Sequence, residues 1–236
     1  MTAINSSEDI KNFLLSNPLK LEIRFHPKEK SILCKKDFSP SRDPIIYFRY
    51  DEPYAYQGKL YYSMTYYMYY KENYAIGLNG IFPTMESLGY HEVDLELVKV
   101  LFKLDLNTGI VKNAIDLVSY VYFSAHSQEG MWVPFDECEK DDNHLVVYSA
   151  YGSHANKPKS GTYMRILGFA NDYTSYYGKW VRPNLINDQT YNRNVSNDEV
   201  LNTPLKRFLM PFYMKNLNKM KEEQKKIEDE RNYGIV

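Results

Sequence analysis

Residues of alternate parity between positions 89 and 105 separate into two chemical sets, as side chains do on the two faces of a β-strand. One set is apolar over most of its length, with Val98, Val100, Phe102 and Leu104. The same set begins with two carboxylates, Asp94 and Glu96. Two carboxylates about 7 Å apart on one strand face are costly unless a cation, a basic side chain or a proton compensates them. If a basic side chain and not a cation compensates Asp94 and Glu96, the candidates are Arg165, Lys179 and Arg182.

The apolar pattern elsewhere predicts a mainly β protein. Residues 6–16 are typical of a short helix, because Ser6 or Ser7 can cap it and apolar residues recur on one face. Short apolar segments separated by turn-forming residues follow, at 19–25, 45–50, 118–125, 131–133 and 145–150. This spacing favours an antiparallel β-sandwich.

The end of the chain returns to a helical pattern. Residues 212–231 carry an apolar stripe among alternating acids and bases, made of Met214, Leu217, Met220 and Ile227. We therefore expect a short N-terminal helix and first strands in 1–50, a β-sandwich core in 51–190, and a C-terminal helical extension in 191–236.

Composition narrows the class of protein. The chain has 236 residues, a net charge of -1 and 23 tyrosines, a residue that favours half-buried strands and interfaces. The balanced charge argues against nucleic acid as a partner. No stretch reaches the roughly 18 apolar residues of a spanning helix, and the N-terminus lacks a signal-peptide pattern. Cys34 and Cys138 are far apart in sequence, as expected for free thiols, so we expect an intracellular protein.

Three histidines stand at expected strand ends. They are His91, just before the two carboxylates, His126, after the strand at 118–125, and His154, after the strand at 145–150. Imidazole and carboxylate together are the usual ligands of Zn, Mn or Fe. The candidate ligands of one divalent cation are therefore His91, Asp94, Glu96, His126 and His154. The alternative is a set of ordinary surface charges at a solvated strand end.

Three motifs in order resemble the vacuolar protein sorting-associated protein sixty-two family. They are the Val-Tyr-Phe-Ser-x-His-Ser run at 121–127 with Trp-Val at 132–133, the Val-Val-Tyr-Ser-x-x-Gly-Ser-His-Ala run at 146–155, and Pro158 with Gly-Thr-Tyr at 161–163. The resemblance covers roughly residues 60–185. It implies a role in protein trafficking, and the candidate binding residues within its motifs are Trp132, Tyr148 and Ser153.

Residues 89–96 fall where that family carries Gly-x-His-x-Gly-Asp-Trp-Glu, with Val93 in place of the second glycine and Leu95 in place of the tryptophan. The same segment is similar to the Gly-His-Arg-His-Asp-Trp-Glu heptad of the necrosis- and ethylene-inducing-like proteins. That likeness implies a β-sandwich with a divalent cation at Asp94 and Glu96.

No enzyme motif stands out, because Gly-x-Ser-x-Gly, His-Glu-x-x-His and a phosphate-binding Gly-Lys-Ser/Thr loop are all missing from the sequence. We therefore expect no catalytic residues and a non-enzymatic binding or structural module, within a larger protein assembly, with a divalent-cation or polar site at one sandwich edge. The alternative is a metal-dependent hydrolase that uses the same histidines and carboxylates.

Overall fold

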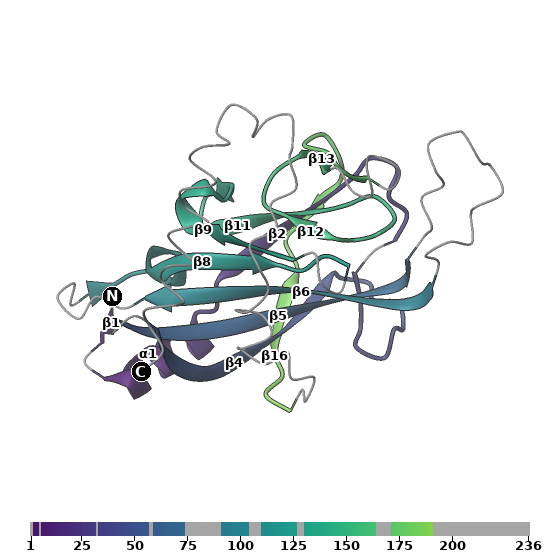
Figure 1. The fold of residues 1–236 in the computed structure, drawn as a ribbon. Coiled ribbons are helices and arrows are strands. Elements are labelled where there is room, and N and C mark those ends of the chain that lie inside the picture. The colour runs from purple at the N-terminus through teal and green to yellow at the C-terminus, as the bar shows by residue number, and fades with distance from the viewer. Residues whose placement is uncertain are drawn as a thin grey trace.

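Two β-sheets pack face to face as a sandwich in the computed structural model (Figure 1), which describes residues 2–4, 6–31, 33–56, 59–73, 91–103, 110–126, 130–163 and 171–190. The larger sheet has seven strands in the described part of the chain. In spatial order they are β16 (Asn184–Asn187), β4 (Ile45–Tyr56), β5 (Lys59–Asn73), β6 (His91–Lys103), β8 (Val118–Phe123) and β9 (Met131–Pro134), with β3 (Leu33–Cys34) beside β5. The expectation of a mainly β sandwich is confirmed.

The second sheet has five described strands. They are β10 (Lys140–Asp141), β11 (His144–Ser149), β2 (Lys20–Phe25) and β15 (Trp180–Val181), with β12 (Asn156–Lys157) beside β11. Two small ladders pair β1 (Thr2–Ala3) with β7 (Ile110–Val111), and β13 (Gly161–Tyr163) with β14 (Asp172–Thr174).

Helix α1, Ser7–Ser16, forms where the sequence predicts it. The Ser6 side chain accepts a hydrogen bond from the backbone N–H of Asp9 at 3.1 Å, which satisfies one of the otherwise unpaired first-turn donors. Its apolar face is buried in the core through Ile10, Phe13 and Leu14. Two short 3-10 turns, η1 (Ala114–Leu117) and η2 (Phe135–Glu137), flank β8 and β9. None of the described helices is long and apolar enough to cross a membrane.

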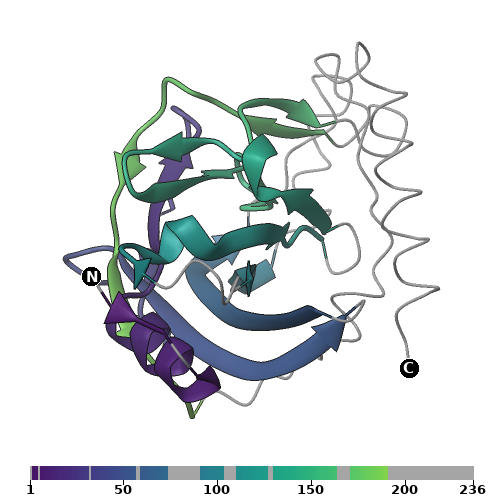
Figure 2. The ribbon, with the colours of Figure 1, turned by 90° about the vertical axis from the view of Figure 1, so that its left-hand side faces the viewer.

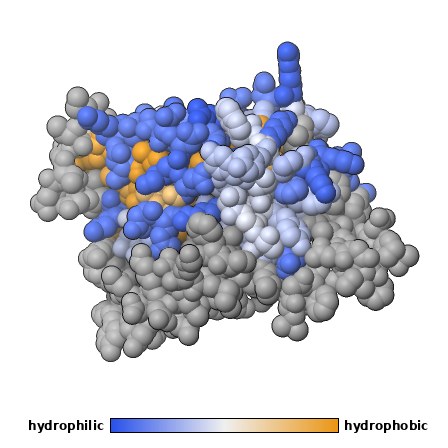
Figure 3. Space-filling model, turned by 90° about the horizontal axis from the view of Figure 1, so that it is seen from above, coloured by the Kyte–Doolittle hydropathy of each residue, from blue (hydrophilic) through white to orange (hydrophobic). Residues whose placement is uncertain are grey.

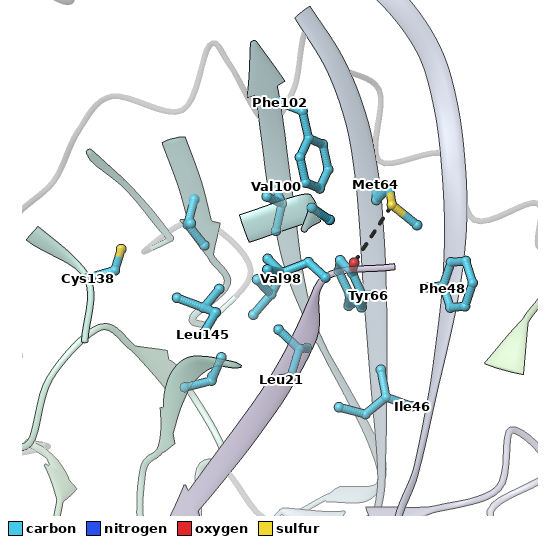
Figure 4. Close-up of a cluster of buried hydrophobic side chains, with 14 of the residues drawn as sticks. Leu21, Ile46, Phe48, Met64, Tyr66, Val98, Val100, Phe102, Cys138 and Leu145 are labelled. Carbon is cyan, nitrogen blue, oxygen red and sulfur yellow. Dashed lines mark hydrogen bonds between the residues drawn. The ribbon is translucent and has the colours of Figure 1, made fainter. Parts of the chain in front are cut away.

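The alternation in residues 89–105 correctly predicts the central strand. Strand β6 pairs antiparallel with β5 on one side and with β8 on the other. Its even-numbered residues Val98, Val100 and Phe102 are completely buried between the two sheets. Figure 4 shows them beside Tyr66 and Met64 of β5, where the Tyr66 hydroxyl donates a weak hydrogen bond of 3.7 Å to the Met64 sulfur.

The sheets are mixed rather than purely antiparallel. Strand β2 runs parallel to β11, and β16 runs parallel to β4. Parallel neighbours need long crossover connections, so local strand-turn-strand spacing cannot reveal them. The antiparallel expectation is therefore wrong at these two pairs.

The expected C-terminal helical extension, 191–236, lies outside the described residues. Strand β4 crosses the expected boundary at residue 50. Strand β2, from the expected N-terminal region, lies between β11 and β15 in the second sheet. The expected boundary between an N-terminal region, 1–50, and a β-sandwich core, 51–190, stays a prediction. Seen from above, the described surface is mostly hydrophilic, with one hydrophobic area on the left of the view (Figure 3).

Candidate functional site

A buried polar cluster forms where β6, the end of β8 and the β11–β12 turn come together. Asp94 and Glu96 enter it from β6, and each is only 6% exposed. The backbone N–H of Asn156 donates to the Ser124 carbonyl at 2.9 Å, and the Asn156 side chain donates to the Leu97 carbonyl at 3.1 Å. These bonds join the two sheets at the cluster, so its side chains are held on fixed backbone.

His154 compensates the charge of Asp94. Its Nδ1 lies 2.9 Å from Asp94 Oδ2, its Nε2 lies 3.7 Å from Glu29 Oε1, and its ring stacks on Tyr70 with centroids 4.0 Å apart. Burial alone would lower the pKa of His154, but the two carboxylates outweigh burial and raise the pKa to about 8. His154 is therefore mainly an imidazolium at neutral pH, held between two carboxylates.

Glu96 keeps its proton instead. Burial, followed by the nearby charge of Asp94, raises the pKa of Glu96 to about 8. The Ser124 hydroxyl donates a hydrogen bond to Glu96, and the Leu97 backbone N–H donates to Ser124 Oγ at 2.8 Å. The two β6 carboxylates thus avoid mutual repulsion in different ways, one by an ion pair and the other by protonation.

Asp172 of β14 is the centre of a second group of contacts. It lies 3.0 Å from Lys157 Nζ and 2.9 Å from His126 Nε2, and Ser153 Oγ donates to it at 2.9 Å. Burial would raise the pKa of Asp172, but Lys157 and His126 together hold the pKa well below its usual range. Because Ser153 precedes His154, the two groups of contacts are neighbours along the backbone.

The expected site residues are brought together in part. Asp94, Glu96 and His154 share the polar cluster, and His126 reaches it through Asp172. His91 opens β6 opposite Asn73. Among the described residues, no group of three or more His, Cys, Asp or Glu side chains is arranged to hold a metal ion.

Within the described part of the chain, the basic group that pairs with Asp94 is His154 and not Arg182. Arg182 binds Glu22 at 3.0 Å and Asp141 at 3.3 Å, away from the polar cluster, and Arg165 lies outside the described residues. His154, expected as a fellow ligand, fills this role. Sequence reasoning also missed Glu29 and Lys157, which carry no recognisable pattern, and it interpreted Asp172 as part of a turn.

The three candidate binding residues lie in three places. Ser153 belongs to the group of contacts around Asp172, beside the polar cluster. Trp132 packs on Tyr122, with ring centroids 5.3 Å apart, on the opposite face of the large sheet. The Tyr148 hydroxyl donates to Glu139 at 2.8 Å and accepts from Arg24 at 3.1 Å in the second sheet. They do not form one binding site.

Val93 carries backbone strain beside the polar cluster. Its φ is 59°, in the left-handed region that a β-branched residue rarely adopts. This is the position at which the signature that the sequence resembles has glycine, the residue that adopts this conformation at no steric cost. Val93 therefore stores backbone strain at this position.

Replacing Val93 with glycine should relieve this strain. We expect Val93→Gly to raise the free energy of unfolding by about 1 kcal/mol, the steric cost of a left-handed residue with a Cβ. The side chain is 49% exposed, so little burial is lost. Urea denaturation measures the effect. Val93→Ala is the matched control, since it shortens the side chain but keeps Cβ, and equal effects of the two substitutions would contradict the strain explanation.

No protein-family model matches this chain. No curated protein matches it in sequence. A solved structure titled "NLPPya in complex with mannosamine" is similar with a TM-score of 0.41 and 13% identity over 92% of this chain and 91% of that chain. The necrosis and ethylene inducing protein 2 of the causal agent of cocoa's witches' broom disease has a TM-score of 0.38 and 17% identity over 79% and 76%. A structure titled "Toxin fold for microbial attack and plant defense" has a TM-score of 0.39 and 12% identity over 79% and 77%.

The necrosis- and ethylene-inducing-like proteins, whose heptad residues 89–96 resemble, therefore also occur among the similar structures. The vacuolar sorting family does not occur among these comparisons. At these TM-scores and identities, the likeness carries no conclusion about what this chain binds.

Proposed function

We propose that this chain is a non-enzymatic β-sandwich binding module that works within a larger protein assembly. One observation carries the proposal, namely an exposed aromatic patch formed by Tyr176, Tyr177 and Trp180. Their exposed fractions are 55%, 88% and 57%. Large aromatic groups in water are costly on a protein surface unless a partner covers them.

The aromatic patch stands on a segment that passes from one sheet to the other. After β14 the chain pairs with β2 through β15 and then with β4 through β16, along one side of the sandwich (Figure 2). The Phe25 backbone N–H donates to the Lys179 carbonyl at 2.8 Å. A Cβ on Gly178 would lie 1.6 Å from the Phe25 carbonyl oxygen, so only glycine allows this close approach. The aromatic side chains therefore project from a fixed backbone.

The surroundings of the aromatic patch suit a protein partner. The Arg24 guanidinium lies 4.8 Å from the centre of the Tyr176 ring, and the Arg182 guanidinium lies 5.4 Å from the Trp180 ring. Tyr, Trp and Arg are the residues enriched at the energetic centres of protein interfaces. A preordered aromatic surface also loses little conformational entropy on binding.

The polar cluster at the sandwich edge would then have a structural role and hold the two sheets of the module in one arrangement. Its carboxylates bond to neighbouring side chains, as in a buried network that specifies one arrangement of the sheets. We place the module inside the cell, because Cys34 and Cys138 are both buried as free thiols, as expected in a reducing compartment.

Site-specific photo-crosslinking tests the proposal. A benzophenone amino acid in place of Tyr177, in cells of the source organism, should yield a discrete crosslinked protein. The same amino acid in place of Asn143, an exposed residue on the β10–β11 turn, is the matched control and should yield none. Trp180→Ser should abolish the product at position 177. Identical products from both positions, or no product from position 177, would contradict a role of the aromatic patch in binding.

A further inference from the structure

The large sheet has a second aromatic face, turned away from the sandwich core. We call it the outer face and define it by Cys34, Tyr47, Tyr61, Tyr67, Tyr69, Leu97, Leu101, Tyr122 and Trp132. These residues alternate along β4, β5, β6, β8 and β9 with the residues that point into the core. The outer face thus extends across the sheet from β4 to β9.

The outer face is buried although the second sheet contributes nothing to it. Every member is 8% exposed or less, and all nine belong to strands of the large sheet. Among the described residues outside these strands, Phe38 packs against the outer face, with its ring 5.5 Å from Tyr69. One face of a single sheet cannot shield its own tyrosines to this degree, so a further layer is required.

Charged side chains on the outer face lead to the same conclusion. Lys99 is 2% exposed and its Nζ lies 3.2 Å from Asp51 Oδ2, while Arg49 donates to the same carboxylate at 2.6 Å. Burial lowers the pKa of Lys99. A buried ion pair on a sheet face indicates that water is excluded from that face.

The described chain stops beside the outer face. The backbone N–H of Asp188 donates to the Phe48 carbonyl at 2.9 Å, at the edge of the large sheet. The Asp188 carboxylate lies 2.8 Å from Lys36 Nζ, and that ammonium lies 5.9 Å from the ring of Tyr47, a member of the outer face. Residues 191–236 thus continue from a point next to this surface.

We propose that residues 191–236 dock on the outer face and form the third layer of the fold. The predicted helix at 212–231 would be about 30 Å long, which matches the roughly 26 Å that β5 spans from Tyr61 to Tyr69. Its apolar stripe would meet the aromatic side chains, and its charged side would face water. This docking surface is separate from the aromatic patch, so the two proposals stand or fall independently.

Tryptophan fluorescence tests the docking, because the chain has two tryptophans and Trp132 lies on the outer face. Trp180→Phe leaves Trp132 as the single reporter. In the full chain, Trp132 should emit at short wavelength and resist quenching by acrylamide. In a chain that ends at Thr190, emission should shift to longer wavelength and the quenching constant should rise several-fold. Adding the peptide 191–236 should reverse both changes.

Point substitutions in the full chain decide the question even if the shortened chain does not fold. Leu217→Lys places a charge on the apolar stripe and should increase quenching of Trp132, whereas the matched control Asn218→Lys should not. Equal quenching in the full chain, the shortened chain and the Leu217→Lys chain would overturn the proposal. So would a shortened chain that sedimentation shows to be monomeric and in which Trp132 stays protected.

Discussion

Asp94→Asn should lower the free energy of unfolding by about 3 kcal/mol, while a chelator should leave the melting temperature unchanged. The substitution removes the carboxylate 2.9 Å from His154 Nδ1, at a position where His154 has no exposed surface. Removing one member of a buried charged pair is more costly than losing a neutral hydrogen bond, and Glu29, the acidic neighbour that His154 would keep, is more distant at 3.7 Å. Chemical denaturation with and without EDTA measures both effects.

Glu92→Gln is the matched control, because Glu92 lies two residues earlier on β6 and is exposed. It should change the free energy of unfolding by less than about 0.5 kcal/mol, as surface substitutions usually do. If the chelator lowers the melting temperature and Asp94→Asn abolishes that sensitivity, the carboxylates hold a cation and pairing with His154 is not their main compensation. If Asp94→Asn is neutral, the polar cluster contributes nothing to stability.

Stability should fall as the pH rises from about 6.5 to about 8. The pKa values of Glu96 and His154 are both raised to about 8 in the folded protein, above their ordinary values of 4.5 and 6.5. In this window the folded protein therefore binds more protons than the unfolded chain, and raising the pH favours unfolding. Each group contributes up to about 1.4 kcal/mol per pH unit between its unfolded and folded pKa.

Denaturation curves at several pH values test this dependence. Glu96→Gln cannot ionise, so it should flatten the pH dependence and leave the smaller part that belongs to His154. The exposed Glu92→Gln control should keep the full dependence. A stability that is constant or that rises between pH 6.5 and 8 would show that neither group is protonated as the burial and contacts imply.

The sequence predicts the elements whose patterns are local. Residues 6–16 contain both a capping serine and an apolar face, and α1 forms there. Even-numbered residues from 94 to 102 share one face of β6, so the placement of Asp94 and Glu96 near the core follows from alternation alone. In both cases the pattern that allows the prediction lies within a single helix or strand.

The other charged residues in and beside the polar cluster could not be predicted in the same way. Glu29 follows β2, Lys157 belongs to a two-residue strand, and Asp172 sits in a stretch that reads as turns. Their roles depend on tertiary contacts: Glu29 lies 125 positions before His154, and Lys157 and Asp172 meet from two different strands. The parallel pairs β2–β11 and β4–β16 could not be predicted for the same reason, because no local pattern indicates which distant strands will pair.

The parallel pairing of β2 with β11 also decides when the N-terminal region can become protected during synthesis. Lys20 pairs with His144 and Phe25 with Ser149, so the backbone of β2 acquires this neighbour only after residues 144–149 have left the ribosome. Contacts so distant in sequence slow folding, because a long loop must close before they contribute. Until then β2 has an open edge and one uncovered apolar face, with Leu21, Ile23 and Phe25, the kind of surface on which chaperones act and from which nascent chains aggregate.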